Sequence, residues 1–437
     1  MKKIGIVITL VVTSMFLFPF EFTFLPGSST KRLLAIAGVI VLIYESSRSR
    51  NAIFNRNVLS LSIIAVIVSL CGLFSSALNE TPDYTYASYI VSMWVWLSAG
   101  YFVVKLINSV HGQANVWILG NYLIGVCVFQ CLAAILIDRY DSVESFVDTY
   151  IYTGQDVIKS MLGMKRKYGI GAIFDVAGSR FSAVIVILAY FLTTAQNMGK
   201  TKWIPFYAFS FFFIAYEGNV IGRTTTIGVI LSCIWFTYQL RKLRFSGENL
   251  HRNALSWSAS ILVVSSCFLI TMYHVDDTFK EDLRFGFEGF FSLWEKGSWE
   301  VASNEKLTNM YVFPDNLKTW IIGDGYFSSP RDTDPYFTGE LVGGYYMGTD
   351  VGYLRFIFYF GLIGLSAISA VMIKSAMICY DAFKEYKTMF IALLAVNFIV
   401  WFKVSTDIFP VFAPFIALSA IKQTDPQKRE TALSFRQ

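Results

Sequence analysis

The sequence has few charged residues for its length. Asp, Glu, Lys and Arg make up 15% of its 437 residues, whereas soluble domains carry about 25%. Hydrophobic residues make up 55% and gather in long runs. A single soluble core of this size is excluded, because too little polar surface would remain to cover it. The composition therefore predicts a polytopic integral membrane protein.

Histidine and cysteine are also scarce. The three histidines are scattered along the chain, which argues against a histidine-based metal site. The six cysteines fall in or beside apolar segments and show neither zinc-ligand spacing nor a disulfide framework. The formal net charge of +5 is too small to suggest nucleic-acid binding. We therefore expect no metal, no cofactor and no nucleic-acid partner.

Twelve apolar runs have the composition of membrane-spanning helices, which need roughly 20 residues each. The runs lie near 4–26, 33–45, 58–78, 86–107, 115–137, 181–197, 203–217, 221–240, 257–274, 351–373, 388–403 and 407–421. The first run begins like a signal peptide, but no small-residue cleavage site follows it, which favours an uncleaved helix. The predicted fold is all-α, a single transmembrane domain over 1–437 with about 12 helices.

The positions of Lys and Arg predict the orientation of these helices. If the N-terminus is inside, the cytoplasmic loops and termini hold 19 Lys and Arg residues, and the short external connections hold only Lys31 and Arg32. Because positive residues concentrate on the cytoplasmic side, both termini are predicted to be cytoplasmic. Two long loops, 138–180 and 275–350, are then external.

The larger external loop is acidic and rich in aromatic residues. It holds fourteen acidic residues, six basic residues and sixteen aromatic residues, among them Tyr345 and Tyr346. Carboxylates accept hydrogen bonds from hydroxyl groups, and aromatic rings offer flat apolar faces, so this mixture suits a carbohydrate. A small folded cap with its own aromatic core would have the same composition, and both interpretations stay open.

Five charged residues lie toward the predicted external face, where a charge is costly to hold near the membrane. They are Arg180, Arg223, Arg284, Asp350 and Arg355. Clustered guanidinium groups suit a phosphate or diphosphate, because they bind its oxygens in pairs and stay charged at any relevant pH. Each arginine alone could instead reach the interface or bind lipid phosphate without specificity.

Asp350 has two interpretations. With Thr349 it stands where the N-cap of the next helix is expected. It could also serve as the base or orienting carboxylate for an attacking sugar hydroxyl. Asp is ordinarily a weak base, but in glycosyl transfer the transition state is oxocarbenium-like, so the hydroxyl need lose its proton only late. Asp350 and Arg355 differ by about 140° around a helix and need not pair directly.

Several short motifs between residues 170 and 370 occur in a distinctive order. Arg180 is followed by Gly-Arg-Thr at 222–224, a large external loop, Gly-Asp-Gly-Tyr at 323–326, Thr-Asp-Val-Gly-Tyr-Leu-Arg at 349–355 and Phe-Gly-Leu-Ile-Gly-Leu at 360–365. This order resembles the O-antigen polymerase (Wzy-type) family, within the superfamily of membrane glycosyltransferases that also includes the O-antigen ligases. Outside this region the resemblance rests on hydropathy.

The resemblance implies a metal-independent enzyme that joins polyprenyl-diphosphate-linked oligosaccharide repeat units at the periplasmic face of the bacterial inner membrane. Arg180 and Arg223 would hold the diphosphates and stabilise the departing charge, with Arg284 assisting. Asp350 stands where ligases of the superfamily tend to place a histidine, which favours a polymerase. Arg355, Tyr345 and Tyr346 are expected to contact substrate.

The implied product is a surface polysaccharide, either the O-antigen of lipopolysaccharide or capsule. The expected partners are the lipid-linked donor and acceptor, membrane lipid, and a chain-length regulator and flippase. An O-antigen ligase that transfers polymer to lipid A core is the nearest alternative. A lipid-linked oligosaccharide flippase or other transporter is less favoured, because the predicted helices are nearly uncharged at mid-depth and the external loops are long.

Overall fold

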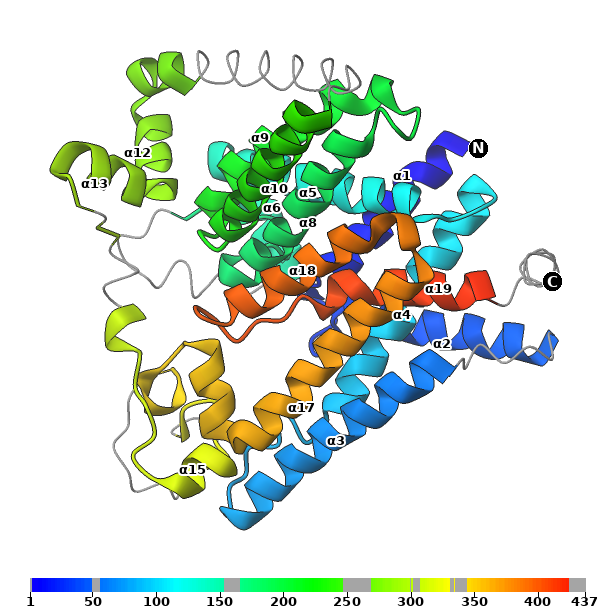
Figure 1. The fold of residues 1–437 in the computed structure, drawn as a ribbon, viewed down its shortest axis with the longest axis vertical. Helices are drawn as coiled ribbons and strands as arrows, with labels where there is room; N and C mark the ends of the chain where they lie inside the picture. The colour runs from blue at the N-terminus through cyan, green and yellow to red at the C-terminus, as the bar shows by residue number, and fades with distance from the viewer. Residues whose placement is uncertain are drawn as a thin grey trace. The chain divides into compact units, whose positions relative to one another are not determined.

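The computed structural model describes residues 2–48, 56–152, 166–246, 269–298, 300–301, 307–330, 334 and 344–423. Within these ranges helices dominate (Figure 1). The chain forms two compact units, each held together by its own internal contacts. Unit 1 comprises Met1–Thr30 and Gly120–Val301, and unit 2 comprises Lys31–Leu119 and Ala302–Gln437.

Six helical segments within the described residues are long and apolar enough to cross a membrane. They are α3 (Arg56–Leu78), α4 (Tyr89–His111), α5 (Val116–Arg139), α8 (Phe174–Thr194), Thr201–Ile221, and α17 (Gly352–Ala382). An all-α protein with membrane-spanning helices is therefore confirmed, while about twelve spans and their orientation stay predictions. Eleven of the twelve predicted runs overlap a helix named in this subsection, and residues 269–274 of the twelfth are also helical. The other run, 257–274, lies mostly outside the described residues.

Unit 1 is built around α8, which is buried along most of its length and contacts α9 (Ile204–Ile221) and α10 (Thr225–Ser246). Small residues let α8 and α10 approach closely, since a Cβ on Gly228 would lie 2.4 Å from the backbone oxygen of Ser182. The remaining elements are α1 (Lys2–Leu17), β1 (Glu21–Phe22), α5, α6 (Asp141–Tyr150), β2 (Ile151–Tyr152), η1 (Thr201–Trp203), α12 (Asp277–Gly286) and α13 (Glu288–Lys296). Strands β1 and β2 pair antiparallel, with Glu21 opposite Tyr152.

Unit 2 is built around α17, which contacts α3, α15 (Leu317–Ile321), α18 (Lys387–Val400) and α19 (Phe409–Gln423). Figure 1 shows α17 running alongside α3. Helix α19 packs on α4 at a glycine, where a Cβ on Gly100 would lie 3.0 Å from the backbone nitrogen of Pro414. The remaining elements are α2 (Thr30–Arg48), η3 (Tyr346–Gly348) and η4 (Lys384–Tyr386).

Helix α17 is interrupted at Phe360 and Gly361. Gly361 has φ 67° and ψ −172°, a backbone conformation that is essentially restricted to glycine. A Cβ at this position would lie 2.1 Å from the backbone oxygen of Ile321. The Phe-Gly pair of the 360–365 motif thus breaks a membrane helix and lets the end of α15 approach the break.

The break in α17 leaves carbonyl groups that need donors other than their own helix. The turn formed by the Gly-Asp-Gly-Tyr motif and a serine of α3 supply them. Asp324 N–H donates to the oxygen of Phe358 at 2.6 Å, Gly325 N–H donates to that of Tyr359 at 3.1 Å, and the Ser75 hydroxyl donates to Tyr359 at 2.6 Å. The Gly-Asp-Gly-Tyr motif therefore stabilises the break at which the 360–365 motif begins.

Helix α1 ends at Leu17 and does not continue to residue 26 as predicted. Its 16 residues span roughly 24 Å, less than the ~30 Å hydrocarbon core of a bilayer. The chain then turns back, and Thr30 N–H donates to the oxygen of Phe20 at 2.8 Å. The prediction was wrong because it followed apolar composition past Pro19, which cannot donate a helical hydrogen bond.

Candidate functional site

The turn that carries Arg223 is held tightly between α9 and α10. Gly222 fits against the first turn of α8, since a Cβ there would lie 2.3 Å from the backbone oxygen of Phe174. The Thr225 hydroxyl lies 2.8 Å from the backbone oxygens of both Gly218 and Gly222, to which it donates. The Gly-Arg-Thr motif therefore forms a rigid connection, and Arg223 precedes α10 where the sequence predicted a position just inside it.

The side chain of Arg223 is 12% exposed and lies against an aromatic ring and a carboxylate. Its guanidinium carbon is 4.1 Å from the centre of the Phe285 ring, and Nη1 is 2.8 Å from Oε2 of Glu288. The guanidinium carbon of Arg166 lies 5.6 Å from the centre of the same ring. Two arginines thus flank Phe285, and we call Arg166, Arg223, Phe285 and Glu288 the arginine site.

Burial lowers the pKa of the Arg223 guanidinium, the Glu288 carboxylate opposes this shift, and the positive charge of Arg166 adds to it. The group still carries its charge near neutral pH, because an arginine titrates far above that range. Two neighbouring, partly buried guanidinium groups can stabilise an additional anion through their charge and through paired hydrogen bonds.

A second charged cluster adjoins the arginine site through Lys167, the neighbour of Arg166. The Lys167 ammonium lies 2.7 Å from Asp282, 3.7 Å from Asp138 and 3.8 Å from Glu217, measured to a carboxylate oxygen in each case. Burial opposes the charged form, but the three carboxylates outweigh it and raise the pKa of Lys167 above its ordinary value. Acidic groups from α5, α9 and α12 therefore share one buried cation.

Lys167→Met is expected to destabilise unit 1 by about 3–5 kcal/mol, because it leaves buried carboxylates without their cation. Because a buried carboxylate that loses its cation binds a proton more readily, protonation relieves part of this loss at pH 7, and the loss should be larger at pH 9. Thermal unfolding of the detergent-solubilised protein measures it. Lys296→Met is the control, because Lys296 is exposed and pairs only at the surface with Glu300, where about 0–1 kcal/mol is at stake. Equal melting temperatures for the two variants would contradict the prediction.

The sequence analysis did not single out Arg166, Lys167, Glu288 or Asp282. One signal was present: Met-Lys-Arg-Lys at 164–167 is a basic run in a predicted external loop, where Lys and Arg are scarce. The acidic partners had no such signal, because they are spread over a loop that holds fourteen acidic residues. Which acidic residues pair with Arg223 and Lys167 depends on how α12 and α13 fold against α9 and α10.

Arg180 lies inside α8, 5% exposed, and not at the start of a helix as predicted. Its Nη1 donates a hydrogen bond of 2.5 Å to the backbone oxygen of Leu17, the last residue of α1. Helices end with carbonyl groups that lack partners, and a cation there also complements the helix dipole. This contact gives Arg180 a structural role at the end of α1, and its diphosphate role stays a prediction.

Arg284 joins α12 to α13 in the large loop. Its Nη1 and Nη2 donate to the two carboxylate oxygens of Glu295 at 2.7 Å each, and Nη1 also donates to the hydroxyl of Tyr273 at 3.1 Å. The hydrogen bonds to Glu295 raise the pKa of Arg284 above its ordinary value. The paired geometry links α12 to α13, and an assisting role for Arg284 in substrate binding stays a prediction.

In unit 2, Asp350 and Arg355 form an ion pair with 3.7 Å between Oδ1 and Nη1. Asp350 and Arg355 are not separated by the 140° expected on one helix, because α17 begins at Gly352 and Asp350 lies before it. Val351 occupies the N-cap position without a side-chain hydrogen bond, so the expected capping role of Asp350 is not seen. The hydroxyl of Thr349 instead accepts a 3.3 Å hydrogen bond from Val351 N–H.

Arg355 is 8% exposed and held from several sides. Its guanidinium carbon lies 3.8 Å from the centre of the Phe327 ring and 4.4 Å from that of the Tyr345 ring. Its nitrogens donate to the hydroxyl of Ser405 at 2.7 Å and to the backbone oxygen of Phe327 at 3.0 Å. Arg355 and Tyr345, two predicted substrate contacts, are thus brought together around the start of α17.

Tyr346 belongs to a cluster of rings and carboxylates in the same unit. Its ring stacks on Tyr326 with 5.3 Å between centres, and its hydroxyl donates to Asp324 at 3.3 Å. The Tyr326 hydroxyl donates to Asp334 at 2.6 Å. Burial raises the pKa of Tyr346, as do the charge of Asp324 and the hydrogen bond to it. These contacts support the interpretation of the loop as a folded cap, and sugar binding by its outer surface stays a prediction.

Asp83 is a buried carboxylate that the sequence analysis missed. It is 3% exposed, and Oδ2 accepts hydrogen bonds from the backbone N–H groups of Phe327 and Ser328 at 2.8 and 3.2 Å. Oδ1 accepts from the N–H and the hydroxyl of Thr85 at 3.0 and 2.6 Å. Asp83 therefore fixes the turn before α4 to the loop that holds Arg355.

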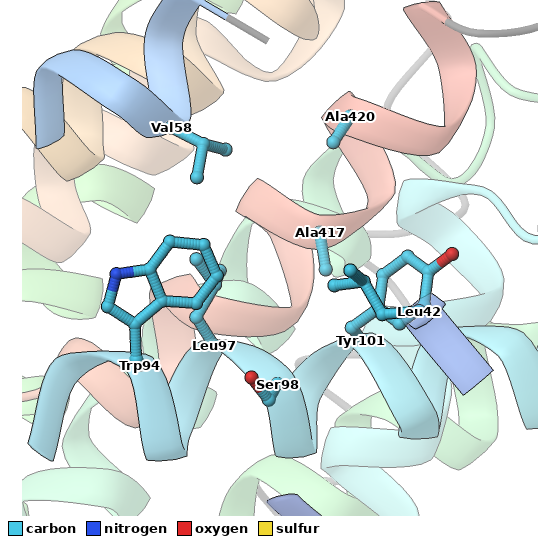
Figure 2. A pocket seen from close by; sticks show the side chains of 8 residues that line it. All are labelled: Leu42, Val58, Trp94, Leu97, Ser98, Tyr101, Ala417 and Ala420. Atoms are coloured by element: carbon cyan, nitrogen blue, oxygen red, sulfur yellow. The ribbon is translucent and has the colours of Figure 1, made fainter. Parts of the chain in front are cut away.

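A small cavity in unit 2 lies among α2, α3, α4 and α19 (Figure 2). Its volume is about 20 Å³, enough for a water molecule, and its wall is almost entirely apolar. The lining residues are Leu42, Val58, Trp94, Leu97, Ser98, Tyr101, Ala417 and Ala420. This cavity lacks the cations that a phosphate site requires, so it is not the candidate site.

In the part of the chain that the structure describes, no three His, Cys, Asp or Glu side chains are arranged to hold a metal ion. Comparisons with protein-family models, with curated proteins and with solved structures find no match for this chain. The resemblance in motif order therefore remains the basis for expecting a family, and the arginine site is the strongest structural candidate for substrate chemistry.

Proposed function

We propose that this protein is a membrane glycosyltransferase that polymerises polyprenyl-diphosphate-linked oligosaccharide units at the periplasmic face of the bacterial inner membrane. The observation that carries the proposal is the arginine site, in which Arg166 and Arg223 flank Phe285 next to membrane-spanning helices. Its cations come from a turn between two apolar helices and from a neighbouring loop, which suits a ligand with an anionic head and a lipid tail.

In the proposed reaction, the bond between the anomeric carbon of the growing chain and its diphosphate oxygen breaks. A hydroxyl of the incoming unit forms the new bond to that carbon and loses its proton to a base. The diphosphate leaves with the bonding electron pair, and Arg223 and Arg166 stabilise its charge. Glu288 holds Arg223 in position before substrate arrives and exchanges with the more highly charged diphosphate.

Deletion of the gene, followed by gel analysis of surface polysaccharide, tests the reaction class. Loss of a polymerase should leave core lipid that carries one repeat unit. Loss of a ligase should leave bare core with polymer still on its carrier, and loss of a flippase should remove both. A normal ladder in a strain without a second polymerase would overturn the proposal, and either of the other patterns would assign the alternative function.

The family resemblance makes Asp350 the expected base, so Asp350→Asn should abolish chain growth while the protein still folds and inserts, because the amide cannot accept the proton. Arg355 keeps its contacts to Ser405 and Phe327 in this variant, so little stability should be lost. The gel ladder and the amount of protein in membranes measure the two effects. Asp381→Asn, at an exposed carboxylate, should retain the full ladder. Normal chain growth in the Asp350 variant would leave Asp350 a structural role, such as its ion pair with Arg355.

A further inference from the structure

Helix α13 exposes an apolar face. Phe290, Leu293 and Trp294 are 53%, 50% and 90% exposed, and their spacing of three and four residues puts them on one side of a helix. Gly289 and Ser292, on the other side, are buried. The helix therefore packs on unit 1 through small residues and presents its largest apolar side chains outward.

The inward side of α13 is well held. The Ser292 hydroxyl donates to the backbone oxygen of Ser298 at 2.8 Å and accepts from Glu300 N–H at 3.0 Å. The ring of Phe291 stacks on Tyr273 with 5.9 Å between centres. These contacts, together with the link from Arg284 to Glu295, fix the orientation of the helix. The outward direction of its apolar face is thus set by packing.

The chain leaves an apolar run directly before α12 and α13. Ile270 and Val275, in the described end of the 257–274 run and just after it, are 61% and 77% exposed, as expected for residues that contact lipid. Helix α12 begins two residues later, at Asp277, and spans roughly 15 Å. Helix α13 follows at once, so a bilayer surface is within its reach. Tryptophan is enriched at such surfaces.

We propose that α13 lies on the membrane surface and inserts Phe290, Leu293 and Trp294 at the boundary between lipid headgroups and acyl chains. The occupant of this face is thus lipid, as in other interfacial amphipathic helices. The described end of the preceding apolar run is also exposed, and the glutamates and Lys296 of the helix remain in water. This anchor would hold the adjoining arginine site at headgroup level, but it is independent of which anion that site binds.

Site-specific photocrosslinking in native membranes tests the proposal on the full chain. The photoreactive amino acid p-benzoylphenylalanine is introduced at Trp294, at Leu293 and, as the matched control on the same helix, at Lys296, which is 62% exposed. After irradiation, mass spectrometry identifies the adducts. Because all three side chains are exposed, the replacements should not disturb folding, and a melting curve of each variant checks this.

The expected result is abundant phospholipid adducts at 294 and 293 and little lipid at 296. Three results would overturn the proposal: equal lipid labelling at all three positions, adducts to another part of this chain, or adducts to a second protein. The second of these would show that the face is covered from within. Activity is not the readout, so failure here leaves the proposed glycosyltransferase untouched, and loss of that function would leave the anchor untouched.

Discussion

Arg223→Ala should abolish chain growth, with a loss of about 100-fold or more, as is found when a preorganised group that stabilises developing charge is removed. The protein should still insert, because the turn that carries Arg223 is held by Gly222 and Thr225 and not by the arginine. The measurements are the ladder of surface polysaccharide and the amount of protein in isolated membranes. Arg223→Lys keeps the charge but loses paired hydrogen bonding. Its chain growth should therefore be intermediate between that of the unaltered protein and that of Arg223→Ala.

Two controls separate substrate binding from the internal ion pair of Arg223. Arg139→Ala removes an exposed arginine of the same unit that pairs with Asp276, and it should leave the ladder unchanged. The double variant Arg223→Ala with Glu288→Ala removes both charges of the internal pair. If chain growth returned in the double variant, Arg223 would serve only to neutralise Glu288, and the diphosphate role would be wrong.

Gly361→Ala should prevent normal folding of unit 2. The φ and ψ of Gly361 cost other residues about 1–3 kcal/mol, and the new Cβ would overlap the backbone oxygen of Ile321 at 2.1 Å. Relief of that overlap would pull α15 away from the break in α17. We expect little folded protein, measured as the yield of the monodisperse species in detergent and as its melting temperature.

Gly297→Ala is the matched control for this prediction. Gly297 ends α13 with a left-handed φ of 73°, and a Cβ there meets no atom within 4 Å. Only the conformational cost of roughly 1–2 kcal/mol applies, so folded protein should form with a modestly lower melting temperature. If the variants at 361 and 297 melted alike, the close approach of α15 to α17 would not be required for folding.

The sequence predicted the spanning helices well where apolar runs are long and uninterrupted. Helices α3, α4 and α5 match the runs 58–78, 86–107 and 115–137 to within four residues at each end, because a chain in lipid must satisfy its backbone groups within each helix. The predicted helix over 4–26 was wrong beyond Leu17, because the apolar composition continues past Pro19 but helical hydrogen bonding does not.

The candidate residues were harder to predict than the helices. Arg223 was identified as a charge near the external end of an apolar run, but its neighbours Arg166 and Phe285 are distant in sequence. The ion pair of Asp350 with Arg355 was not expected, because a regular helix was assumed to include Asp350, whereas α17 starts at Gly352. Side-chain partners across long loops depend on tertiary packing, which hydropathy does not describe.

The low charge content and the long apolar runs by themselves determined that this chain is helical and membrane-embedded, because lipid offers no hydrogen-bond partners to the polar groups of the backbone. Only the tertiary structure determined which side chains lie next to Arg223. Close packing at Gly222 fixes the turn of Arg223, and the folding of α12 and α13 brings Phe285 and Glu288 to it. A buried charged group interacts only with the few side chains packed around it, so tertiary packing determines its role.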